Sequence, residues 1–203
     1  MNFRYIDAHA HLQDKAFEGD QSAVLEKMKA EGVAALMIGT DLEYSKQAVA
    51  LAEAHENLWA VVGLHPTDNT NESFDIASYK KLAESPKVVG IGECGLDYYR
   101  TGRETVHELQ KDKFVQQMAL AVLLGKPLMI HCRPSPNTQD AHEDLLSLFE
   151  EAKRTYGENL RGNIHFFTGT LDIARRYNAL GFTVSFSGVI TFAREYDEVI
   201  RGI

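Results

Sequence analysis

The sequence predicts an α/β fold of the (β/α) TIM-barrel type, with seven of the eight strands of such a barrel visible. Short apolar runs alternate with amphipathic segments from one end of the 203-residue chain to the other. Several of these runs are continuous in Val, Ile and Leu, as expected of parallel strands covered on both faces. A strand followed by a helix, repeated without a break in composition, indicates a parallel sheet and a single domain over residues 1–203.

Seven apolar runs are assigned to strands. They are Phe3–Ala8, Val33–Gly39, Leu58–Gly63, Val88–Gly92, Pro127–His131, Arg161–Phe166 and Phe182–Ser185. The segments between them are assigned to helices at Asp20–Glu31, Tyr44–His55, Ile76–Glu84, Arg103–Leu124, Ala141–Tyr156 and Leu171–Leu180, and another helix begins at Glu195–Ile200. An open doubly wound sheet is the alternative, but no glycine-rich phosphate loop follows the first strand, which lowers that option.

Composition and charge narrow the class of protein. The chain is 44% hydrophobic and 25% charged, as in ordinary globular proteins. No apolar run has the length of a membrane span, so we expect a cytoplasmic protein with no membrane partner. The net charge of −8 argues against simple electrostatic binding of nucleic acid. It leaves open an enzyme that holds phosphates through bound cations, because these ions supply positive charge locally.

The first strand leads into two histidines, His9 and His11, separated by one residue. Side chains alternate between the faces of a strand, so the two imidazoles are expected to point the same way. Two imidazoles on one face can bind a divalent cation together. An ordinary polar strand end is the alternative for this pair taken alone.

Four later strand ends carry further histidines or carboxylates. They are, in chain order, His65, then Glu93 with Asp97, then His131 with Arg133, and finally His165. Neutral imidazoles suit zinc and its neighbours, and a carboxylate can bridge two cations. We expect Glu93 to be the bridge, because glycines on both sides of it allow close approach of the backbone.

Other residues near these positions are given plainer interpretations. Cys94 and Cys132 should turn away from the site as small buried apolar residues, because side chains alternate along a strand. The helical histidine His142 is expected at the solvated surface. Tyr98, Tyr99 and Arg100 either clamp a nucleotide by stacking or belong to an ordinary packed loop.

These motifs together resemble those of the TatD-type metal-dependent deoxyribonucleases. The matching segments are Asp7-Ala8-His9-Ala10-His11-Leu12, Gly63-Leu64-His65-Pro66, Gly92-Glu93-Cys94-Gly95-Leu96-Asp97-Tyr98-Tyr99, Ile130-His131-Cys132-Arg133 and His165-Phe166-Phe167-Thr168-Gly169. The resemblance implies a barrel that holds one or two divalent cations (Zn, Mg or Mn) and hydrolyses phosphodiester bonds in DNA, commonly as an exonuclease.

The resemblance also implies a role for each matched residue. His9 and His11 would bind the first metal, and Glu93 would bridge the metals as the catalytic carboxylate. The second metal would be bound by His131 and His165. Contact with the substrate would come from His65, Asp97 and Arg133.

The chain departs from the family pattern in two places. Phe166 stands where the family usually has cysteine; alternation predicts that it faces the helical shell, with little effect on function. The family's eighth strand ends in Glu-Thr-Asp, whose aspartate binds the first metal and acts as general base, and this sequence has no such motif.

Two hypotheses account for the missing strand. In the first, the physiological protein is longer than this sequence and is an ordinary nuclease. In the second, self-association or a partner covers the open edge of the barrel, and the chain is a binding or structural module or an impaired enzyme.

A third reading is a barrel hydrolase of small amides, lactones or phosphotriesters, in which a modified lysine often bridges the metals. Lys87 and Lys126 lie at strand starts, the wrong end for that role.

Overall fold

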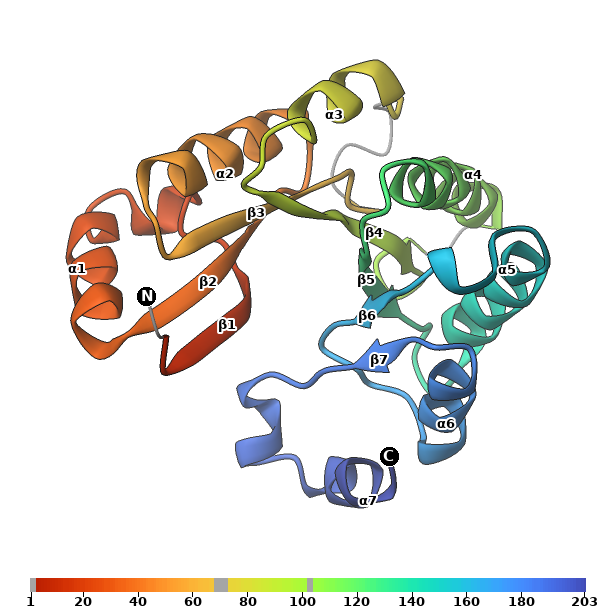
Figure 1. The fold of residues 1–203 in the computed structure, drawn as a ribbon. Coiled ribbons are helices and arrows are strands. Elements are labelled where there is room, and N and C mark those ends of the chain that lie inside the picture. Colours follow the sequence, from red (N-terminus) through yellow and green to blue (C-terminus); the bar gives the residue numbers. More distant parts are fainter. Residues whose placement is uncertain (1–2, 68–72, 102–103) are drawn as a thin grey trace.

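Seven parallel strands form one curled sheet in the order β1 to β7, which confirms the predicted barrel-type α/β arrangement (Figure 1). The computed structural model describes residues 3–67, 73–101 and 104–203. The strands are β1 (Tyr5–Ala10), β2 (Val33–Ile38), β3 (Leu58–Val62), β4 (Val88–Asp97), β5 (Leu128–Arg133), β6 (Gly162–Ile164) and β7 (Thr183–Val184). Because every pair of neighbouring strands is parallel, their carboxyl ends gather at one rim.

Most of the helices lie on the outer, convex side of the sheet (Figure 1), and the C-terminal helix packs beside the helix before it, beyond the last strand. The helices are α1 (Gln21–Glu31), α2 (Leu42–Ala54), α3 (Ile76–Leu82), α4 (Glu104–Leu123), α5 (Asp140–Tyr156), α6 (Leu171–Ala179) and α7 (Asp197–Gly202). Their ends follow local chemistry. The side chain of Asp41 accepts a hydrogen bond from the Tyr44 amide at the start of α2. Gly32 ends α1 in the left-handed conformation, with φ +69°. In the described part of the chain, no helix is long and apolar enough to cross a membrane.

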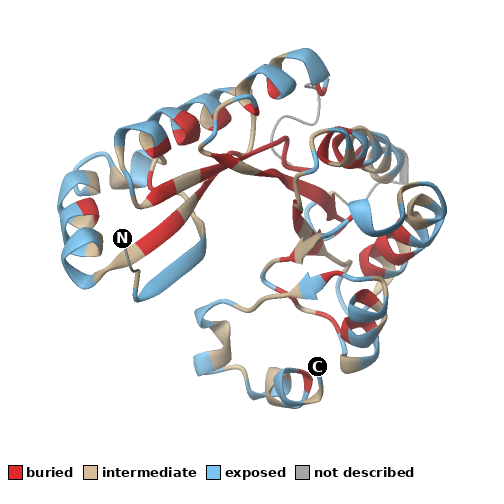
Figure 2. Ribbon diagram, in the orientation of Figure 1, coloured by how far each residue is buried: buried red, intermediate tan, exposed pale blue. Residues whose placement is uncertain are grey.

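Most buried side chains lie between the sheet and these helices (Figure 2). Phe149 of α5 is fully buried there and stacks on Phe182 with ring centroids 4.0 Å apart. A much smaller cluster fills the concave side of the sheet, built on Ile38, Val61 and Met129. The two clusters show that the central strands are covered on both faces, as their continuous apolar sequences predict.

The outer strands of the sheet are less enclosed than the central ones. Among the described residues, β1 pairs with β2 and β7 pairs with β6, and no ladder joins β1 to β7. Tyr5 and Ile6 on β1 are 57% and 63% exposed despite their apolar character. This is the edge at which the sequence predicts self-association, and that expectation stays a prediction.

Two strands differ most in length from the sequence expectation. β4 continues beyond Gly92 to Asp97, because its residues keep pairing with β5 as far as the partners Asp97 and Arg133. Glu93 therefore lies within a strand and not just past its end. β6 is shorter than expected and ends at Ile164, so strand alternation does not extend to the residues that follow it.

Gly92 and Gly95 let β4 and β5 approach each other closely around Glu93. Both have positive φ values, +143° and +134°. A Cβ atom on Gly92 would overlap the carbonyl oxygen of Met129, and one on Gly95 would overlap that of His131. The sequence predicts that the glycines beside Glu93 let another part of the backbone come close. The structure shows that this part is β5.

We predict that Gly95→Ala destabilises the protein by about 3 kcal/mol or more, because the added methyl group meets rigid backbone at a strained φ. Urea unfolding followed by circular dichroism measures this. Gly19→Ala is the matched control, since nothing lies within 4 Å of its Cβ position, and it should change stability by less than about 0.5 kcal/mol. Equal midpoints for the two variants would contradict this account of the β4–β5 contact.

Candidate metal centre

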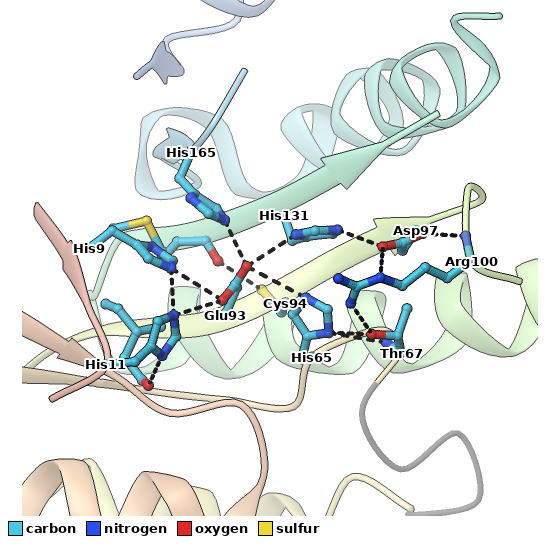
Figure 3. Close-up of polar contacts among 12 residues, drawn as sticks. His9, His11, His65, Thr67, Glu93, Cys94, Asp97, Arg100, His131 and His165 are labelled. Atoms are coloured by element: carbon cyan, nitrogen blue, oxygen red, sulfur yellow. Dashed lines mark hydrogen bonds and ion pairs between the residues drawn. The ribbon is translucent and has the colours of Figure 1, made fainter. Parts of the chain in front are cut away.

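A pocket of about 510 Å³ opens at the carboxyl ends of the strands. It is lined by His9, His11, His65, Glu93, Arg100, His131, Cys132, Arg133, His165, Phe166, Thr168 and Tyr196. The structure brings the five predicted metal ligands and His65, a predicted substrate contact, to this one pocket. Five of these six residues are histidines, and the sixth is Glu93. Figure 3 shows their side chains converging on Glu93 from β1, from the segments after β1, β3 and β6, and from β5.

Glu93 is the centre of this arrangement. Its carboxylate is only 6% exposed and lies close to five imidazoles. The shortest nitrogen–oxygen distances are 2.7 Å for His165, 3.1 Å for His131, 3.3 Å for His9, 3.6 Å for His65 and 3.9 Å for His11. Burial alone would raise the pKa of Glu93, but hydrogen bonds from His131, His165 and His9 hold it well below its usual value. The carboxylate is therefore ionised at neutral pH.

The geometry at β1 directs two imidazoles towards this carboxylate. β1 carries an extra residue relative to β2 between Asp7 and Ala10, and the His9 amide donates to the Asp7 side chain at 3.0 Å. The Nε2 atoms of His9 and His11 lie 3.1 Å apart, so the two rings share one face as the sequence predicts. This bulge aims side chains into the site.

His11 and His65 are held in opposite tautomers by their neighbours. The Nδ1 of His11 donates to the carbonyl oxygen of Ile38 at 3.0 Å, which leaves the Nε2 lone pair facing the pocket. The Nδ1 of His65 instead accepts from the Thr67 amide at 3.2 Å, which puts the proton on its Nε2. Burial lowers the pKa of His11, and it lowers that of His65 to about 3, so both rings are neutral.

His131 lies between two carboxylates. Its Nδ1 is 3.1 Å from Glu93 and its Nε2 is 3.0 Å from Asp97. Burial acts to lower the pKa of His131, but Asp97 and Glu93 together raise it above its usual value. Asp97 is fully buried and also accepts from the Arg100 amide at 2.8 Å, so it orients His131 from behind. Direct contact between Asp97 and substrate stays a prediction.

The donor atoms fall into two triads that share Glu93. Within each triad the candidate ligand atoms lie within 4.8 Å of one another. One triad contains His9 and His165, whose rings are stacked at 3.7 Å, and the other contains His65 and His131. These triads differ from the sequence prediction, which assigns His9 and His11 to one metal and His131 and His165 to the other.

The donor set fits a divalent cation. Five imidazoles crowd around one ionised carboxylate, which can accept from their N–H groups but offers nothing to their nitrogen lone pairs, whereas a cation would bind both the lone pairs and the carboxylate. In addition, the Nδ1 of His9 is buried with no hydrogen-bond partner. Imidazole nitrogens with a shared carboxylate are typical ligands of zinc and related ions.

Two arginines line the same pocket. The guanidinium of Arg133, a residue predicted to contact substrate, stacks on the ring of Tyr99 at 3.8 Å. Arg100 donates to the Thr67 hydroxyl at 3.3 Å and lies 4.0 Å from the Asp97 carboxylate. The sequence places Arg100 only beside the tyrosines of its loop, because its contact with Thr67 joins segments far apart in the chain.

The structure corrects the expected position of Phe166. It does not face the helical shell: its side chain is 43% exposed and lines the pocket. β6 has already ended at Ile164, and Phe166 adopts the left-handed conformation with φ +48°. The following residue, Phe167, is the one that is fully buried.

The two cysteines are buried among apolar residues, as predicted, although Cys132 also forms part of the pocket wall. Burial raises the pKa of Cys94 and of Cys132 above the usual thiol value. The expectation for His142 is wrong. This residue is fully buried, and its Nδ1 lies 3.1 Å from both the Cys132 sulfur and the Tyr177 hydroxyl.

Comparison with known proteins agrees with this fold. The family model described as "TatD related DNase" matches residues 6–203. An uncharacterized metal-dependent hydrolase of Bacillus subtilis, YabD, is 34% identical over 98% of this chain and 75% of its own length. A 3'-5' ssDNA/RNA exonuclease TatD of Enterobacter lignolyticus is 36% identical over 82% of this chain, and the chain spans 61% of that relative's length.

Among solved structures, the Escherichia coli TatD homologue YjjV superposes with a TM-score of 0.85 at 28% identity. That match covers all of this chain and 76% of YjjV. With the fold, the order of motifs and the metal-dependent relatives in agreement, the chain belongs to the family of TatD-related DNases.

Proposed function

We propose that this protein is a metal-dependent phosphodiesterase that removes nucleotides from single-stranded nucleic acid. The observation that carries the proposal is a buried, ionised carboxylate surrounded by five imidazoles, in the same pocket as two arginines. The first group of residues suits cations and the second suits phosphate. The printed names of relatives that are 3'-5' ssDNA/RNA exonucleases support single-stranded DNA as the first substrate to test.

The candidate ligands divide among one or two divalent cations. Because the protonated Nε2 of His65 has no lone pair for a metal, we keep the grouping implied by the sequence resemblance, with His9, His11 and Glu93 for one cation and Glu93, His131 and His165 for the other. A bound cation lowers the pKa of its water and neutralises charge on the phosphate. Imidazole-rich ligation favours zinc or manganese, while magnesium is common in phosphodiester chemistry. The Glu93 carboxylate, ionised and buried, would also accept a hydrogen bond from the attacking water.

His65 is placed to bind the phosphate. Its Nδ1 accepts from the Thr67 amide, so its Nε2 carries the proton and faces the pocket. Because its pKa is about 3, it donates as a neutral imidazole over the whole physiological range. This tautomer favours substrate binding over metal ligation for His65, in line with the role implied by the sequence resemblance.

The structure offers no support for a small-molecule hydrolase with a bridging lysine. The described residues that line the pocket include no lysine. Lys87 donates to the carbonyl oxygens of His55 and Leu58, and Lys126 donates to that of Val88, so both serve the opposite ends of the strands.

We predict that His131→Ala lowers the rate of nucleotide release from single-stranded DNA by about 100-fold or more, because it removes a candidate ligand and leaves Asp97 without its partner. EDTA should abolish release, and added Mg²⁺, Mn²⁺ or Zn²⁺ should restore it in the wild type. The matched control is His55→Ala, a histidine at the end of α2 that should leave the rate unchanged. Metal-independent release would refute the proposal, and tight binding without release would favour a binding module.

We predict that Arg133→Gln raises KM for a single-stranded oligonucleotide by about tenfold with kcat nearly unchanged, because a phosphate contact is lost (about 1.4 kcal/mol). Arg133→Lys should restore little, since an ammonium does not reproduce the planar stack on Tyr99. Arg161→Gln is the control, because this exposed arginine donates to Gly125 at the start of β5. Steady-state kinetics decide the matter, and full activity of Arg133→Gln would exclude the contact.

A further inference from the structure

Phe166 occupies an unusual position beside the metal centre. It directly follows the candidate ligand His165, and the two rings are 6.5 Å apart at an interplanar angle of 32°. Its φ of +48° is rare for a bulky residue, because the Cβ atom crowds the backbone in that conformation. Strained residues of this kind persist where the surrounding structure or the function requires them.

Packing does not explain this position. Phe166 is 43% exposed and belongs to neither of the two buried apolar clusters. The core at this point is already filled by Phe167, which is fully buried against Tyr177 and Phe186. Hydrophobic burial therefore accounts for Phe167, and the ring of Phe166 is left at the wall of the pocket.

The same pocket holds the chemistry that recognises a nucleotide on its other sides. Arg133 and Arg100 supply positive charge, and the pocket of about 510 Å³ has the volume of a small-ligand site. Within the described residues no carboxylate forms an ion pair with Arg133, whose guanidinium lies on Tyr99. Arginine side chains together with an exposed aromatic ring are the combination that binds single strands through phosphate contacts and base stacking.

We propose that Phe166 is a stacking platform for one nucleobase of the bound strand, next to the phosphate at the metal centre. This inference rests on the proposed function and extends it, because it assigns a base-recognising subsite to a residue that departs from the family pattern. The stacked ring makes Phe166 a specificity-determining residue. Substrates with a purine at this subsite should be preferred over those without a base, because only a base offers a π-face that can stack on the ring of Phe166.

The kinetic test compares matched oligodeoxynucleotides that carry adenine or an abasic residue at the terminal or the penultimate position. For the wild type, kcat/KM should fall by about tenfold when the base is missing at one of these positions. Phe166→Leu keeps an apolar side chain and removes the π-face, so it should bring this ratio close to one. Phe166→Trp should keep the ratio or increase it.

A binding test reports stacking without catalysis. An oligonucleotide with 2-aminopurine at the sensitive position should lose fluorescence on binding to the wild type and to Phe166→Trp, but not to Phe166→Leu. The matched control is Phe192→Leu, an exposed phenylalanine that is not among the residues lining the pocket. It should behave as the wild type in both assays, and equal thermal midpoints for all variants exclude a folding effect.

The outcomes separate this inference from the proposed function. If the wild type releases nucleotides but Phe166→Leu keeps its preference for a base, the platform is refuted and the nuclease stands. If no protein releases nucleotides yet 2-aminopurine quenching depends on Phe166, the platform stands and the nuclease is refuted. A wild type that hydrolyses DNA with neither base preference nor quenching also overturns the platform.

Discussion

The burial of the Glu93 charge is the constraint on which this structure depends. An ionised carboxylate that is almost removed from water is costly unless polar groups surround it. Here the compensation comes from imidazoles carried by distant segments, and no single strand could supply them. The sheet must curl so that the carboxyl ends of β1, β3, β5 and β6 converge on β4. The barrel curvature and the site are thus two aspects of one electrostatic requirement.

The register of β4 determines which of its side chains face the pocket and which face the helices. Cys94 and Leu96 pack into the helical shell, while Glu93 faces the pocket. A slip of one residue would exchange these faces, leaving a charge among apolar side chains. The glycines at positions 92 and 95 allow β5 to lie close enough for His131 to reach both Glu93 and Asp97. Small residues in the strand therefore determine where the large polar ones meet.

Sequence patterns predict the strands and the donor residues well, because both follow from local periodicity. All seven strands form where the apolar runs predict them, and six predicted histidine and carboxylate positions meet in one pocket. The failures involve contacts between distant segments. Phe166 escapes the alternation rule because pairing with β7 ends at Ile164. His142 contacts Cys132 and Tyr177 from distant segments, although its place three, four and seven residues before Leu145, Leu146 and Phe149 on α5 also predicts a buried position.

The two halves of the site differ in how firmly the fold holds them. Glu93 and His131 lie on β4 and β5, each paired with neighbours on both sides. His9 lies on β1, whose described ladder is with β2 alone and whose apolar residues are largely exposed. A cation shared by His9 and Glu93 would bind only the conformation in which β1 is docked, and would stabilise that conformation by mass action. Metal binding at His9 would therefore be coupled to the docking of this edge strand, with the buried carboxylate as their common point.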